Sequence, residues 1–258
     1  MSLVVNNLSF SYSDKKILDN ISFNIEAGDF VCVLGKNGVG KSTLFKLLLG
    51  FLKKQSGRIL IDEKEVEHFN RKELAREVAY IPQYTTSAFN YSVFDTVLMG
   101  TTCRLDTLGS PKAKEKKIAL DALKQFKIDH LAHKYSDSIS GGERQLVVLA
   151  RAIAQGSKIL ILDEPTANLD YGNQVRVMQT ISTLKKQGYS IILSTHNPEQ
   201  ALWFSDKVMF LDDKKILSFG KTNEVISSTL LKQIYGIDID LIEKDGRKLC
   251  FPRISNNV

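Results

Sequence analysis

The sequence has few cysteines and no long hydrophobic run, and each of these absences excludes a class of protein. Its three cysteines, Cys32, Cys103 and Cys250, form no CxxC pair and are odd in number, which favours a reducing compartment and argues against a metal cluster. The most apolar stretch, 44–52, is interrupted by Lys46 and is far shorter than the roughly 20 residues that span a membrane. Because no basic region precedes a long apolar one at the N-terminus, we expect no signal peptide. We therefore expect a soluble cytoplasmic protein, whose work at a membrane would require docking on another subunit.

The composition is otherwise that of an ordinary globular protein, with 43% hydrophobic and 25% charged residues. This excludes intrinsic disorder, collagen and disulfide scaffolds, and no internal repeat or low-complexity tract is present. A length of 258 residues suits one large α/β domain, or one domain with an inserted lobe. The formal charge of +6 attracts anions such as nucleotides, nucleic acid or acidic lipid, but it does not choose among them.

Strand-like and helical patterns alternate along most of the chain. Short β-rich runs dominate the first forty residues, and a helical pattern with an apolar face follows Gly40. The predicted strands are 3–10, 22–25, 30–34, 58–61, 78–81, 159–162, 190–194 and 208–211. Strands that alternate with helices indicate a mostly parallel, buried sheet.

The stretch 84–154 differs, because it contains no convincing strand. Residues 112–126 read as one charged amphipathic helix, whose apolar side is Ile118, Leu120, Leu123 and Phe126. We interpret 84–154 as a helical lobe inserted between two strands of the sheet. The predicted main domain is 1–230, and 231–258 is a short C-terminal accessory segment.

A glycine-rich loop follows the apolar strand 30–34 and opens the next helix. Its residues fit the pattern G-x-x-x-x-G-K-[ST]: Gly35, Lys36, Asn37, Gly38, Val39, Gly40, Lys41 and Ser42. Glycines let backbone N–H groups turn inward around phosphate oxygens, and the helix N-terminus adds partial positive charge. Lys41 is expected to reach the β- and γ-phosphates and the Ser42 hydroxyl to ligate Mg²⁺. The loop predicts a nucleoside triphosphate site.

Two adjacent carboxylates end the aliphatic strand 159–162. Asp163 is placed to hold the Mg²⁺ shell, and Glu164 to accept a proton from the attacking water. An acidic cap on a strand-to-turn junction is the structural alternative.

A second potential anion-binding nest, Ser140-Gly141-Gly142, precedes a helix that carries Leu146, Leu149 and Ile153. On local grounds it also fits a simple N-cap, with Ser140 capping and Glu143 at the third helical position.

Taken in order, these motifs resemble the ATPase subunit of ATP-binding cassette (ABC) transporters over nearly the whole chain. The matching elements are the loop at Gly35, Gln83 after a strand, Ser140-Gly141-Gly142, Asp163-Glu164, Asn168-Leu169-Asp170, and His196 after a strand. The resemblance implies an α/β P-loop NTPase fold of the ABC ATPase type. That fold has a mostly parallel sheet core, an N-terminal antiparallel β subdomain and an inserted helical lobe.

The resemblance also implies a head-to-tail homodimer that hydrolyses two sandwiched ATP molecules. Each ATP would touch the 35–42 loop and Thr43 of one subunit, and the Ser140-Gly141-Gly142-Glu143 segment of the other. Gln83 would ligate Mg²⁺ and sense the γ-phosphate, as His196 would from another side. Asn168, Leu169 and Asp170 would line the dimer seam. Tyr12 resembles the aromatic residue that stacks on adenine, with core packing as its structural alternative. For His196 the alternative is a core or capping histidine.

The signature segment departs from the family's usual Leu-Ser-Gly-Gly-Gln. Ile139 replaces Leu, which is a mild apolar change, and Glu143 replaces Gln. Glutamate adds a negative charge near the partner's ATP, so we expect Glu143 to face away from the phosphates or to pair with Arg144. We expect Glu143 to leave hydrolysis in place and to affect only its rate.

A single cassette without fused membrane helices resembles importer subunits more than exporters. The segments 91–100 and 169–174 look like the branch that serves metal-chelate importers, which includes ferric siderophore, haem, cobalamin and some molybdate or tungstate systems. This branch implies a polytopic membrane permease dimer, an indirect extracytoplasmic substrate-binding protein, a peripheral place on the cytoplasmic face of the cell membrane, and no nucleic-acid partner. An apolar cluster of Phe89, Tyr91, Val93 and Phe94 favours a membrane partner, with lobe core as its alternative. The rival function is a soluble ABC ATPase that acts in assembly or regulation.

Overall fold

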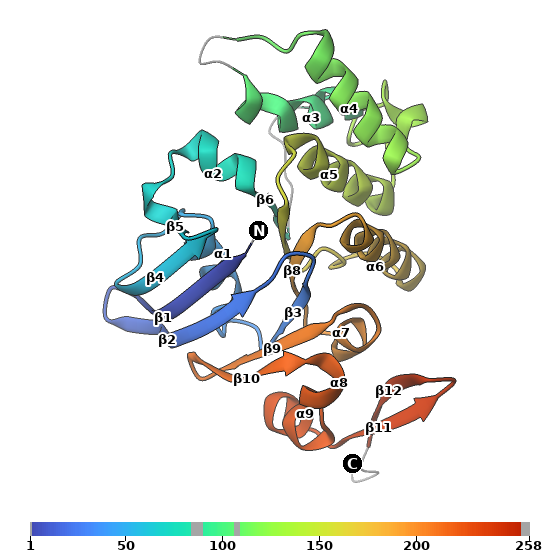
Figure 1. Cartoon of the computed structure of the whole chain (residues 1–258). Coiled ribbons are helices and arrows are strands. Elements are labelled where there is room, and N and C mark those ends of the chain that lie inside the picture. The colour runs from blue at the N-terminus through green and yellow to red at the C-terminus, as the bar shows by residue number, and fades with distance from the viewer. Residues whose placement is uncertain (1, 84–89, 106–108, 254–258) are drawn as a thin grey trace. The chain divides into compact units, whose positions relative to one another are not determined.

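The structure is a computed structural model that describes residues 2–83, 90–105 and 109–253 (Figure 1). The chain divides into two compact units: residues 1–65 together with 192–258, and residues 66–191. Within the described residues, no helix combines the length and the apolar character needed to cross a membrane.

The first unit contains a four-stranded antiparallel sheet in the order β2-β1-β4-β5. Its strands are β1 (Leu3–Tyr12), β2 (Lys15–Ile25), β4 (Ser56–Ile61) and β5 (Lys64–Glu65). In β1 the buried side chains switch phase between Val5 and Leu8, where the register with β2 shifts. Asn7 lies there with a φ of 50° and donates through Nδ2 to Asn20 Oδ1 at 2.7 Å. This bulge keeps the apolar residues of β1 on one face, and the sheet confirms the predicted antiparallel β subdomain.

The first unit also contains the strands β10-β9-β3-β8 in that order. They are β3 (Phe30–Leu34), β8 (Ser190–Ser194, which crosses the unit boundary), β9 (Lys207–Asp212) and β10 (Lys215–Lys221). Every residue of β3 and β8 is buried, and β3 pairs with β9 in parallel. Fully buried strands with aliphatic runs are typical of a parallel sheet core, as predicted.

Strand β10 was not predicted from the sequence. It returns antiparallel to β9 through Asp213 and Lys214, which both have positive φ, 38° and 70°. Two-residue hairpin turns with positive φ at both positions normally contain Gly or Asn. The pair Asp213-Lys214 has lysine where glycine is usual, so the pattern of residues does not predict a hairpin here.

Residues 198–252 fold as part of the first unit. Besides β9 and β10, they form α7 (Pro198–Phe204), α8 (Thr222–Val225), α9 (Ser228–Tyr235), β11 (Ile239–Lys244) and β12 (Arg247–Pro252). The strands β11 and β12 form a hairpin closed by Asp245 and Gly246, both with positive φ, which is the ordinary chemistry of such a turn. The predicted boundary between residues 230 and 231 falls within α9.

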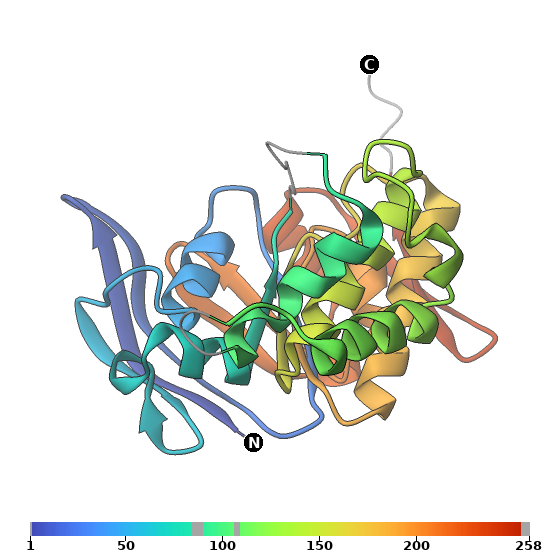
Figure 2. The same cartoon turned by 90° about the horizontal axis from the view of Figure 1, so that it is seen from above.

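The second unit is mainly helical. Its elements are α2 (Arg71–Glu77), β6 (Val78–Ile81), α3 (Val93–Leu98), α4 (Ala113–Gln125), α5 (Gly141–Gln155), β7 (Ile159–Asp163) and α6 (Tyr171–Lys186), with 3₁₀ turns at Val66–His68, Met99–Arg104 and Asp129–Leu131. Helices α3, α4 and α5 pack on one another and lie side by side in two views (Figures 1 and 2). Strands β6 and β7 pair in parallel.

The predicted helix at 112–126 is confirmed as α4, but its buried face differs from the predicted one in two residues. Leu120 is 39% exposed and Ile118 is half-buried, whereas Ala119, Ala122 and Leu123 are buried and Phe126 follows at the C-cap. Residues 119, 122, 123 and 126 follow the helical repeat, and Leu120 lies beside that stripe rather than within it. No strand occurs at 90–105 or 109–154, apart from an isolated bridge between Ser92 and Tyr135.

Candidate nucleotide-binding and hydrolysis residues

The glycine-rich loop joins β3 to α1 (Lys41–Leu48) in the first unit. Gly35 has a φ of 157°, and a Cβ atom at this position would lie 2.4 Å from the Leu211 carbonyl oxygen of β9. Only glycine therefore lets the loop leave β3 so close to the neighbouring strand. The Lys41 side chain turns back over the loop, and its Nζ donates to the Gly35 and Lys36 carbonyls at 2.8 and 3.2 Å.

The burial of Lys41 is the clearest sign of a binding role in this loop. The residue is only 5% exposed, although its side chain carries a full charge. A buried ammonium is costly unless it is compensated, and phosphate oxygens are strong acceptors for such a charge. The loop thus presents a desolvated cation, together with the exposed Ser42 hydroxyl at the start of α1. This arrangement fits a triphosphate.

The β1–β2 hairpin lies against the same loop. Gly40, the N-cap of α1, has a φ of 115°, and a Cβ there would meet Ile17 and Leu18 side chains at 3.1 Å. Tyr12 pairs with Lys15 at the turn of this hairpin and is 44% exposed. Its ring packs edge-on against Phe10, with ring centroids 4.8 Å apart. Tyr12 is therefore not a core residue, and its ring is accessible to a planar base.

His196 follows β8 in the first unit. Thr195 N–H donates to the Val33 carbonyl of β3 at 3.2 Å, which aligns the ends of these two neighbouring strands. His196 directly follows Thr195, and Gly35 follows Val33 by two residues. The His196 side chain is exposed, and its carbonyl accepts a hydrogen bond from the Tyr235 hydroxyl at 3.1 Å. Within this unit the structure brings His196 and the glycine-rich loop to neighbouring strand ends.

Asp163 ends β7 in the second unit and is 5% exposed. The Tyr80 hydroxyl of β6 donates to Asp163 Oδ2 over a long 3.5 Å. Burial, and next the negative charge of Asp163, raise the pKa of Tyr80 to about 12, so the phenol stays protonated and can remain a donor. Tyr80 was not identified as a site residue from the sequence. The signal that could have indicated it is a tyrosine hydroxyl in a buried strand, three residues before Gln83.

Glu164 adopts a left-handed backbone, with a φ of 47°. Such a conformation is costly for a residue with a side chain, and it persists only where the surroundings impose it. Gln83 Nε2 donates to Glu164 Oε2 at 3.2 Å, so the structure brings together the two residues that were predicted to sense and hydrolyse the γ-phosphate. A half-buried carboxylate held in this way is chemically suited to accept a proton from water.

The Ser140 segment forms a capping box at the start of α5. Ser140 Oγ accepts from Glu143 N–H at 3.2 Å, while Glu143 Oε2 accepts from Ser140 N–H at 2.8 Å and from its hydroxyl at 2.7 Å. These hydrogen bonds lower the pKa of Glu143. The N-cap interpretation is thus confirmed. Pairing of Glu143 with Arg144 is not observed, because Arg144 donates instead to the Ser136 and Ile139 carbonyls.

The same unit places the Asn168-Leu169-Asp170 segment beside the capping box. A Cβ on Gly142 would lie 2.7 Å from Asn173 Oδ1, and one on Gly141 would touch Leu169 at 3.3 Å. Asp170 caps α6, accepting from Asn173 N–H at 2.9 Å. Gly141 and Gly142 therefore let α5 start directly against this segment, while Ser140 and Gly141 remain exposed.

Comparison with known proteins agrees with these features. The family model described as "ABC transporter" matches residues 18–167. An uncharacterized ABC transporter ATP-binding protein of Haemophilus influenzae is 40% identical over 95% of this chain and 93% of its own length. The "Probable iron chelatin transport ATP-binding protein" of Helicobacter pylori strain 26695 is 37% identical over 97% of this chain and 99% of its own.

Two further comparisons extend this result. The molybdate import ATP-binding protein MolC of Haemophilus influenzae is 36% identical over 91% of this chain and 88% of its own. A solved chain of a metal-chelate type ABC transporter in an inward-facing conformation superposes with a TM-score of 0.87 and 31% identity, covering 100% of this chain and 99% of its own. The protein therefore belongs to the ABC transporter family, as an ATP-binding subunit with the ABC ATPase fold and ATPase activity.

Proposed function

We propose that this chain is the ATP-hydrolysing subunit of an importer for a metal chelate or a related metal oxyanion. The observation that carries the proposal is the end-to-end match with relatives of this kind. The Helicobacter iron chelatin protein and the metal-chelate type transporter chain both align over at least 97% of this chain and 99% of their own. The molybdate relative widens the substrate class to an oxyanion.

ATP is bound, in this proposal, by residues 35–43, with Lys41 on the β- and γ-phosphates and Tyr12 against the adenine. The buried Lys41 ammonium and the exposed Tyr12 ring support these roles. Ser42, Gln83 and Asp163 offer hydroxyl, amide and carboxylate oxygens, which are the hard ligands that Mg²⁺ prefers. Bound Mg²⁺ would neutralise charge on the phosphate oxygens.

Glu164 is the general base, and Gln83 and His196 respond to the γ-phosphate. The hydrogen bond between Gln83 and Glu164 supports a coupled role, since a movement of Gln83 changes the environment of the base. His196 supplies a polar side chain at the end of β8, close in its unit to the glycine-rich loop.

Two copies of the chain bind two ATP molecules head to tail. Ser140, Gly141 and Gly142 contact the ATP of the partner subunit, Glu143 adjoins it, and Asn168, Leu169 and Asp170 line the seam. Two features support this arrangement: Ser140 and Gly141 are exposed at a helix start, and the Leu169 side chain would lie 3.3 Å from a Cβ on Gly141. The capping box engages the Ser140 N–H and hydroxyl with the Glu143 carboxylate, so contact of Ser140 with a phosphate requires these hydrogen bonds to be exchanged.

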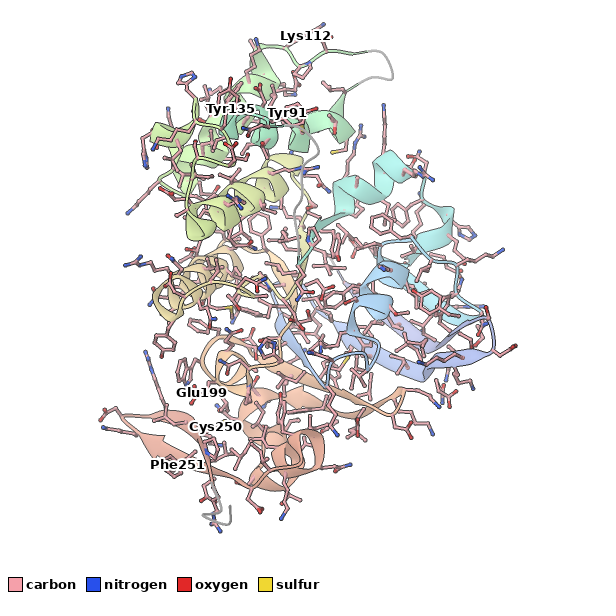
Figure 3. The ribbon with its side chains drawn as sticks, turned by 180° about the vertical axis from the view of Figure 1, so that it is seen from behind. Tyr91, Lys112, Tyr135, Glu199, Cys250 and Phe251 are labelled. Carbon is pink, nitrogen blue, oxygen red and sulfur yellow. The ribbon has the colours of Figure 1, made fainter. Side chains whose placement is uncertain are left out.

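A polytopic permease dimer docks on the helical lobe from the cytoplasmic face of the membrane. Of the predicted apolar cluster, Phe89 lies outside the described residues and Val93 is buried in the lobe. Tyr91 is 38% exposed and lies close to Tyr135, which is 56% exposed (Figure 3). This aromatic pair, linked by Ser136 N–H donation to the Tyr91 carbonyl at 3.2 Å, is the surface we assign to the permease.

Uptake by intact cells tests the proposal. Cells that lack the chain should lose uptake of a radiolabelled ferric siderophore, haem, cobalamin or molybdate, and the wild-type chain should restore it. The Glu164→Gln variant should fail to restore it at equal abundance. Normal uptake of all four substrates in the deletion strain, with soluble proteins as the only copurifying partners, would instead favour the assembly or regulatory function.

A further inference from the structure

The C-terminal hairpin is fastened to the helix that follows His196. Trp203 Nε1 of α7 donates to the Lys248 carbonyl of β12 at 3.0 Å. Cys250 N–H of β12 donates to Glu199 Oε1 of α7 at 3.2 Å, and Glu199 and Cys250 lie next to each other in the side-chain view (Figure 3). These contacts join β12 to α7 at both its first turn and its last, so the hairpin and α7 are expected to move together.

A second connection runs from α9 directly to His196. Tyr235 is the last residue of α9, which ends at Gly236 with a φ of 75°. The half-buried Tyr235 side chain donates its hydroxyl to the His196 carbonyl oxygen at 3.1 Å. Burial, and next the neighbouring Cys250, raise the pKa of Tyr235, so the phenol remains a donor at every pH at which a protein of this kind works.

The residues on either side of His196 are held from within the core of the unit. Thr195 N–H donates to the Val33 carbonyl, and Thr195 Oγ1 donates to Gln200 Oε1 at 2.7 Å. Asn197 N–H donates to Thr195 Oγ1 at 3.1 Å. The His196 carbonyl itself, however, is bonded by the C-terminal segment. Because a peptide plane rotates as one body, a donor on this oxygen fixes the backbone orientation from which the histidine side chain projects.

We infer that the C-terminal segment 228–252 is a brace for the loop that carries His196, and that Tyr235 is the positioning residue that acts through the His196 carbonyl. The segment is thus part of the hydrolytic machinery rather than a passive appendage. This inference rests on the proposed role of His196 at the γ-phosphate. The hydrogen bond from Tyr235 to the His196 carbonyl should therefore affect the turnover rate but not the affinity for ATP.

The test compares Tyr235→Phe with Tyr189→Phe in the purified full-length chain. Both variants remove one hydroxyl from a half-buried tyrosine whose pKa is raised by burial, but Tyr189 precedes β8 whereas His196 follows it, at the opposite end of the strand. For Tyr235→Phe we expect the kcat for ATP to fall about three- to tenfold, which corresponds to one hydrogen bond, with the KM for ATP within about twofold of wild type. Tyr189→Phe should match the wild type.

A double-variant cycle with His196→Ala separates positioning from general loosening of the fold. If Tyr235 acts through His196, adding Tyr235→Phe to His196→Ala should change the single-turnover rate by less than about twofold. An equal fold-loss in the two backgrounds would overturn the inference, as would wild-type kcat in Tyr235→Phe alone. If His196→Ala itself keeps the wild-type rate, the proposed role of His196 fails and the inference fails with it. If His196→Ala is slow but Tyr235→Phe has the wild-type rate, the inference about Tyr235 is rejected while the proposed role of His196 stands.

Discussion

Replacement of Glu164 by glutamine tests the assignment of the general base. The change is isosteric, and the new side chain keeps an oxygen that can accept the 3.2 Å hydrogen bond from Gln83 Nε2. The left-handed backbone at position 164 is equally costly for both residues, so the local structure and the thermal stability should be preserved. What is lost is a carboxylate able to take a proton from water.

The magnitude follows from the usual contribution of general base catalysis. Such a group contributes roughly 10²- to 10⁴-fold to the rate, which is about 3–5 kcal/mol in the activation free energy. We expect kcat, measured by phosphate release, to fall by that factor, while ATP affinity, measured by equilibrium binding, stays within about threefold. Since ATP would then persist, ATP should also shift the variant from monomer to dimer in light scattering.

Glu115→Gln is the matched control for this experiment. Glu115 accepts from Lys112 N–H at 2.9 Å at the start of α4, so the same chemical change alters a carboxylate that has only a capping role. Its kcat should equal that of the wild type. A Glu164→Gln variant whose kcat stays within about threefold of wild type would refute the role of Glu164, because the loss of a general base costs at least about a hundredfold.

Three further substitutions probe the other parts of the site. Lys41→Ala should weaken ATP binding at least about tenfold, because it removes a desolvated charge from the phosphates; unaltered affinity in a binding titration would contradict that placement. Gly35→Ala should lower the free energy of unfolding by about 1–3 kcal/mol, since its Cβ would lie 2.4 Å from the Leu211 carbonyl oxygen; an unchanged denaturant midpoint would show that the strand ends separate easily. Ser140→Arg should leave ATP binding by the isolated monomer intact while it abolishes hydrolysis by the dimer; loss of monomer binding would argue against contact with the partner's ATP.

The sequence predicted the chemistry of the site better than its supporting contacts. The glycine-rich loop, Asp163 and Glu164 are recognisable because each places particular residue types beside a strand or helix end, which is a local pattern. The hydrogen bonds of Tyr80 with Asp163 and of Tyr235 with His196 join residues far apart in the chain. Nothing near Tyr235 in the sequence indicates its acceptor, so such contacts become visible only in the folded unit.

The fold shows the same division between local and distant information. Strand 30–34 and the helix at 112–126 were predicted because their apolar residues follow the repeat of the element. Strand β10 was missed because its turn uses Asp213 and Lys214 in place of Gly or Asn. The partner of Glu143 could not be predicted for a related reason. A capping box with Ser140 and an ion pair with Arg144 are both compatible with its position in the sequence, and the backbone geometry decides between them.

Purification of this chain from its native membranes in a gentle detergent distinguishes transport from assembly. We expect a polytopic membrane protein to copurify in an equal amount, and ATP hydrolysis by the complex to be lost in the Glu164→Gln variant. Recovery of the chain only with soluble scaffold or ribosomal proteins would contradict the transport function, while leaving the ATPase itself in place.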